Sequence, residues 1–71
     1  MDIEKLEQLG DELRGVGHRR RKLVEQVYRE LKEGDRETSK ELYQELSMVS
    51  DKAIGIIEQQ KQLFDEQVRE V

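Results

Sequence analysis

The side chains that could do chemistry in this sequence are 17 carboxylates, 13 basic groups and one histidine, His18. Carboxylates on helices can hold a pair of metal ions when a Glu-x-x-His motif accompanies them. The residues three positions before and after His18 are Gly15 and Arg21, so this motif is absent. A single histidine and no cysteine also argue against a zinc site. We therefore expect no metal and no cofactor.

Nucleophilic catalysis needs a hydroxyl or thiol beside a base. The second half of the chain has four serine and threonine hydroxyls, but the sequence ties none of them to His18. The segment Gly15-Val16-Gly17-His18 lacks the lysine and serine that complete a phosphate-binding loop. The sequence thus predicts no catalytic residue, no small-molecule substrate and no enzyme activity.

The most conspicuous charged feature is a basic belt at residues 14–22. No acid lies between Leu13 and Val24, although the chain as a whole has a net charge of −4. Such a belt can contact the phosphates of nucleic acid or an anionic protein surface, but no aromatic residue is interleaved to stack on bases. Alternatively, its arginines pair with acids of a neighbouring subunit. The candidate contacts are Arg14, His18, Arg19, Arg21 and Lys22.

Helical spacing decides which of these side chains lie together. Because successive residues turn by about 100°, the belt spreads around the helix. Arg14, His18, Arg21 and Lys22 are expected to share one face, whereas Arg20 falls among the apolar positions. A charge cannot stay unpaired in a dry core, so Arg20 must reach the edge or meet an acid.

The first half of the chain predicts one amphipathic helix with a heptad-like period of 3.5 residues. Its expected apolar stripe consists of Ile3, Leu6, Leu9, Leu13, Val16, Arg20, Leu23, Val27 and Leu31. Gly10, Gly15 and Gly17 each cost about 1 kcal/mol in a helix interior. They either break the helix or permit close packing against residues 53–57, and we expect Gly17 to be packed and Gly15 exposed.

The second half predicts another helix, with a mean spacing of 3.6 residues and an 11-residue repeat. This period favours nearly straight packing. The expected stripe consists of Leu42, Leu46, Val49, Ala53, Ile57, Gln60, Phe64, Val68 and Val71. Gln60 is the only polar residue in it.

A short turn separates the two stripes. Gly34 can take the left-handed conformation that ends a helix, and the next helix can start at Asp35 or at Thr38 with Glu41. We expect a single domain over 1–71, with a helix at 2–33, a turn at 34–37 and a helix at 38–70. The short connection makes the helices antiparallel, so that Arg20 faces Val49.

The predicted fold class is an all-α antiparallel helical hairpin that dimerises into a four-helix bundle. A chain of 71 residues without cysteine has little core of its own, which favours association. The spare apolar face would then form a dimer or partner interface. Its candidate residues are Ile54, Ile56, Ile57, Leu63 and Phe64. The arrangement of the two hairpins stays open, as do a different protein on this face and a fragment of a longer coiled coil.

These observations favour a small, cytoplasmic, non-enzymatic regulatory or adaptor protein. It would be a homodimer that acts through helix-mediated protein–protein interaction, with no contact to a membrane. The alternative function is a nucleic-acid-binding helical dimer that uses the basic belt at residues 14–22. A protein partner is favoured because the molecule is acidic overall.

Overall fold

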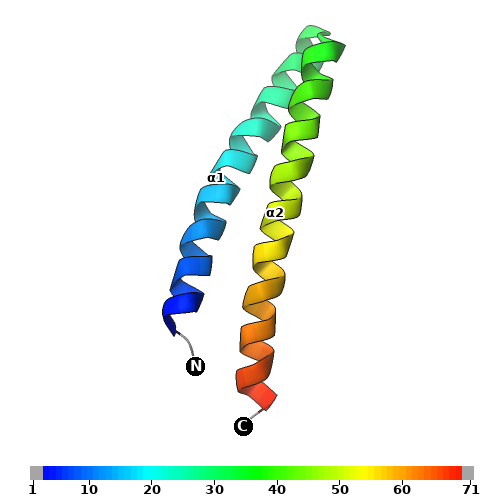
Figure 1. Ribbon diagram of the computed structural model, residues 1–71. Helices are drawn as coiled ribbons and strands as arrows, with labels where there is room; N and C mark the ends of the chain where they lie inside the picture. Colours follow the sequence, from blue (N-terminus) through cyan, green and yellow to red (C-terminus); the bar gives the residue numbers. More distant parts are fainter. Residues whose placement is uncertain (1–2, 70–71) are drawn as a thin grey trace.

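The protein is an all-α helical hairpin (Figure 1). The structure, a computed structural model, describes residues 3–69. Helix α1 spans Ile3–Glu33 and helix α2 spans Arg36–Arg69. The helices pack against each other in a rod with extents of 54 × 17 × 13 Å. α1 runs unbroken through its three glycines, so the predicted alternative of a break near Gly17 is wrong.

The turn contains two residues, Gly34 and Asp35, and is shorter than the predicted 34–37. Gly34 has a φ of 85°, the left-handed conformation that glycine adopts without steric cost. Its N–H donates to the Leu31 carbonyl at 3.2 Å, and the Asp35 N–H donates to the Glu30 carbonyl at 2.9 Å. These two bonds satisfy carbonyls that the end of α1 would otherwise leave free.

Asp35 is the N-cap of α2. Its Oδ1 accepts the backbone N–H of Thr38 at 3.0 Å, and its Oδ2 accepts the Thr38 hydroxyl at 2.8 Å. The backbone hydrogen bond, followed by the hydroxyl bond, lowers the pKa of Asp35 below its ordinary value of 3.8. Of the two predicted starts, the structure therefore selects Asp35, and α2 begins at Arg36 rather than at residue 38.

The seam between the helices follows a heptad pattern on both sides. On α1 the predicted stripe is confirmed at its apolar centre, where Leu9 and Leu23 are buried. It is wrong at its two ends, since Ile3 and Leu31 are each 60% exposed. On α2, steps of three and four residues continue past Ala53 to residues that are buried or half-buried. The α2 seam consists of Ser39, Leu42, Leu46, Val49, Ala53, Ile56, Gln60, Leu63 and Gln67.

The predicted 11-residue stripe of α2 is wrong at Ile57, Phe64 and Val68, although its residue Gln60 lies in the seam. Ile56 is 3% exposed, whereas Ile57 and Phe64 are each 49% exposed and Val68 is 71% exposed. The physical reason is that two helices share a long seam only when their apolar periods agree, and α1 carries a heptad period. Val71, the last residue of the predicted stripe, lies outside the described residues.

The core of the hairpin is small. Leu9, Leu23 and Ile56 are its buried apolar residues within 3–69. A Cβ atom added at Gly10, Gly15 or Gly17 would meet nothing within 4 Å. The expected close approach of α1 to residues 53–57 at Gly17 is therefore absent within one hairpin.

Candidate functional site

The hairpin divides the basic belt into two groups. Arg19 and Arg20 extend towards α2, where Arg19 forms an ion pair with Glu45 and the Arg20 Nε donates to the Ser50 hydroxyl at 2.9 Å. Arg14, His18 and Arg21 instead line a shallow depression on the exposed surface of α1. Arg19, one of the candidate contact residues, is thus separated from the others.

Arg20 occupies a seam position but remains exposed. Its bond to Ser50 places its side chain one residue away from the predicted neighbour, Val49. The aliphatic part of an arginine can cover apolar surface while its guanidinium stays in water. The seam therefore accommodates this charge at its edge, without a buried acid.

The exposed basic group on α1 is weakly paired. Arg14 lies 4.0 Å from the Asp11 carboxylate, with both side chains more than three-quarters exposed. Surface pairs of this kind contribute little stability. Lys22 is also exposed, one residue beyond Arg21. We call Arg14, His18, Arg21 and Lys22 the basic patch; their predicted common face is consistent with the depression that the first three line.

The two bonds across the hairpin define its two sides. Arg19 and Arg20 are adjacent in sequence, about 100° apart on α1, and leave the seam on opposite sides. The Arg20–Ser50 bond closes one side and the Arg19–Glu45 pair closes the other. We call the side closed by Arg20 and Ser50 the Ser50 face.

The Ser50 face carries nearly all of the exposed apolar surface. Ten large apolar side chains are exposed within residues 3–69, and helical geometry places all except Met48 on this face. Four of them belong to α1 and five to α2, so both helices contribute. The nine residues are Ile3, Val24, Tyr28, Leu31, Tyr43, Ile54, Ile57, Phe64 and Val68.

Ile54, Ile57 and Phe64 of the predicted interface lie on this face. Ile56 and Leu63 instead pack in the seam, so their side chains face α1. Sequence reasoning missed the contributions of α1 and of Val68. The sequence contains a signal for this face, because two sets of residues repeat at a constant spacing of seven. These sets are Ile3, Gly10, Gly17, Val24 and Leu31 on α1, and Tyr43, Ser50, Ile57 and Phe64 on α2.

The charged residues also differ between the two sides of the hairpin. Seven-residue spacing places one acid within residues 3–69, Glu7, on the Ser50 face, at its outer edge. The basic residues of this face outnumber that acid; they are Arg14, Arg20, Arg21, Arg36, Lys40 and Lys61. The other acids lie on the opposite side and on the outer surfaces of the helices. The Ser50 face is thus apolar with a positive edge.

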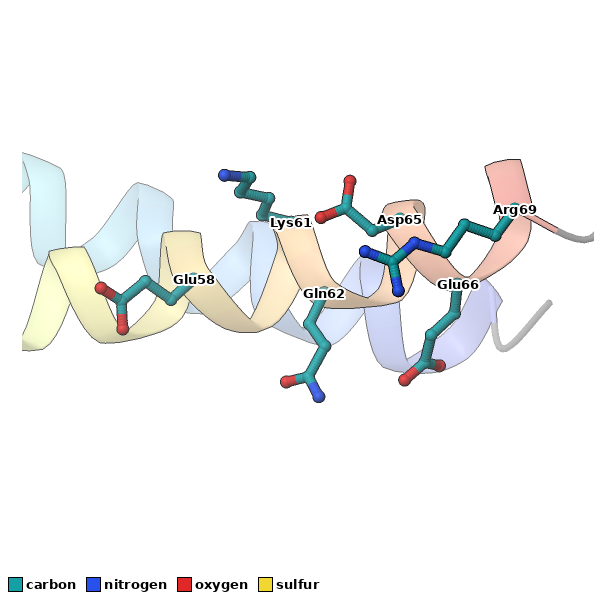
Figure 2. Close-up of a pocket in the computed structure, with 6 residues that line it drawn as sticks. All are labelled: Glu58, Lys61, Gln62, Asp65, Glu66 and Arg69. Atoms are coloured by element: carbon teal, nitrogen blue, oxygen red, sulfur yellow. The ribbon is translucent and has the colours of Figure 1, made fainter.

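A second surface depression lies on the distal half of α2, where five charged side chains and one glutamine line it. Figure 2 shows these side chains projecting from the helix in several directions without converging on one point. They are Glu58, Lys61, Gln62, Asp65, Glu66 and Arg69. Across residues 3–69, no group of three or more histidine, aspartate or glutamate side chains is placed to hold a metal ion.

Comparisons with known protein families, curated proteins and solved structures found no match. Neither helix, as far as the structure describes it, has a stretch long and apolar enough to cross a membrane. The Ser50 face and the basic patch are therefore the two features from which a function can be argued.

Proposed function

We propose that the protein is a small regulatory or adaptor protein without enzymatic activity. It acts in the cytoplasm as a homodimer, through helix-mediated protein–protein interaction. The observation that carries the proposal is the Ser50 face, where nine large apolar side chains of both helices are exposed together. Apolar patches of this kind, bordered by polar residues, mark interaction sites.

The surface area of the hairpin supports association. Its solvent-accessible surface is 6021 Å². A typical folded monomer of its mass, 8.4 kDa, exposes about 4,600 Å². The chain has no disulfide and few buried apolar residues, so covering this surplus would add stability that one hairpin lacks.

The outer surfaces are available to the regulated partner once the Ser50 face is covered. His18 and Lys22 of the basic patch point away from the seam, whereas Arg14 and Arg21 lie at the outer edge of the Ser50 face. All acids within residues 3–69 except Glu7 lie outside that face. Complementary charge steers association and fixes its orientation. We therefore expect the basic patch to bind an acidic surface of a protein partner.

A pull-down from the native host with a charge-reversed control tests this function. We expect wild-type protein to retain a specific protein at low salt. The double variant His18→Glu/Lys22→Glu, at the two patch positions outside the Ser50 face, should lose it while its dimer mass and helical circular dichroism are unchanged. A double variant on the other side of the rod, Glu41→Lys/Glu66→Lys, is the matched control and should bind normally. Equal retention by both variants would contradict the role of the basic patch.

Nucleic-acid binding is the second candidate, because three belt residues line one depression in a segment without acids. A salt series with a duplex DNA and a hairpin RNA separates the two candidates. Each phosphate contact contributes about −0.9 to the slope of log K against log salt on duplex DNA. A steep negative slope that becomes shallower in Arg21→Ala and Lys22→Ala would favour nucleic-acid binding. Arg19→Ala should matter less, because Arg19 is paired with Glu45.

A further inference from the structure

We infer that a second copy of this chain covers the Ser50 face with both turns at the same end of the bundle. In this arrangement α1 of one copy packs on α2 of the other. The inference rests on the proposed dimer and specifies both its interface and its orientation. Three observations carry it: the exposed area, the position of the basic belt, and the open space at two glycines.

The surplus exposed surface of two hairpins matches the area that obligate homodimers bury. Two separate hairpins expose twice 6021 Å². A compact protein of twice the mass exposes about 7,700 Å² by the usual scaling with mass. The difference is about 4,300 Å², and obligate homodimers bury about 2,000–5,000 Å². One further copy is thus sufficient to cover the surplus.

Two copies related by a two-fold axis can pack their Ser50 faces together in two ways. With the turns at the same end, α1 meets α2 of the second copy in the same register as in the hairpin. With the turns at opposite ends, α1 meets α1 of the second copy. Gly17 then lies near the symmetry axis, because it is the middle residue of the set from Ile3 to Leu31. Both arrangements make every neighbouring helix pair antiparallel.

Charge favours the first arrangement. With the turns at opposite ends, the two basic belts would face each other, and Arg20 and Arg21 of both copies would meet at the centre. Like charges opposed across an interface are unfavourable. With the turns at the same end, the belt of one copy lies at the level of residues 47–55 of the other. This segment contains one acid and one base, Asp51 and Lys52, so it presents no net positive charge to the belt.

Shape favours the same arrangement. Added Cβ atoms at Gly10 and Gly17 would meet nothing within 4 Å, so both glycines leave open space on the Ser50 face. At their level on α2 lie Ile54 and Ile57, which are about half exposed in the single hairpin. Packing α1 on α2 of the second copy places large side chains opposite small ones. Packing α1 on α1 places Gly17 opposite Gly17 and leaves the space empty.

Distance measurement between spin labels tests the orientation. The chain has no cysteine, so Arg36→Cys and His18→Cys each provide one label per copy. Arg36 is the first residue of α2 beside the turn, and His18 lies in the middle of α1. With the turns at the same end, the labels at both positions should be separated by less than half of the 54 Å length of the rod.

Each other outcome has a distinct meaning. A short distance at residue 18 with a separation near the rod length at residue 36 would overturn the inferred orientation and leave the dimer intact. A monomer mass in sedimentation equilibrium, with no dipolar coupling at either position, would overturn the proposed dimer itself. The pull-down with the basic-patch variants then tests the regulatory function independently.

Discussion

The Arg20 Nε lies 2.9 Å from the Ser50 hydroxyl oxygen and joins α1 to α2 at the edge of the seam. The bond carries a charged side chain out of an apolar stripe without burying the charge. It also marks the side of the hairpin on which the apolar surface is exposed. Arg19, the preceding residue, pairs with Glu45 on the other side.

Arg20→Leu should raise the melting temperature. Leucine at this position adds an apolar group to the seam, whereas the exposed bond to Ser50 contributes about 1 kcal/mol or less. Ser50→Ala is the matched control and should lower the stability slightly. Thermal unfolding followed by circular dichroism checks both variants. A large loss of stability in Arg20→Leu would show that the arginine contributes more than its hydrogen bond.

Ile57→Asp should dissociate the protein. Ile57 lies at the centre of the Ser50 face, and a charge there would be desolvated without a partner. Met48→Asp is the control, since Met48 is exposed on the opposite side. Sedimentation equilibrium at micromolar concentration should give about twice 8.4 kDa for wild type and Met48→Asp. Unfolding of Ile57→Asp together with dissociation agrees with an obligate dimer. A stable monomer in the wild type would contradict the bundle.

The three glycines of α1 should respond differently to alanine. Gly15 is exposed away from the Ser50 face, so Gly15→Ala should stabilise by about 0.4–1 kcal/mol through reduced entropy of the unfolded chain. Gly17→Ala should give a smaller gain or a loss, because in the inferred dimer its space is filled by the second copy. Equal gains at residues 15 and 17 in chemical denaturation would indicate that this space stays open.

Stability should fall in acid through the cap of α2. The pKa of Asp35 is lower in the folded protein than its ordinary value of 3.8. Its contribution is therefore present above the unfolded pKa and is lost as the pH falls through the lower folded pKa. Asp35→Asn keeps a capping oxygen at every pH. Its melting temperature should thus depend less on pH below about 5 than that of wild type. Parallel curves would contradict the assigned cap.

Much of the fold could be predicted because it depends on local sequence. The stripe predicted from Ile3 to Leu31 has one period, and it predicted both α1 and, except at its two exposed ends, the face of α1 that packs on α2. Gly34 was predicted to end α1 because glycine takes a positive φ without steric cost. The spacing of Arg14, His18 and Arg21 predicted that they share a face, since helical geometry alone sets it. Two helices joined by a short turn then follow as an antiparallel hairpin.

Only the tertiary structure decided which apolar residues of α2 form the seam. Ile56-Ile57 and Leu63-Phe64 are adjacent apolar pairs, so either member of each pair could face α1 by its own sequence pattern. Packing against the heptad period of α1 selects Ile56 and Leu63 and leaves the other two exposed. The position of the seam in turn separates Arg19 from Arg20 and places the exposed apolar residues on one face. Such choices depend on the partner helix, because one helix alone does not determine which of two neighbouring stripes is covered.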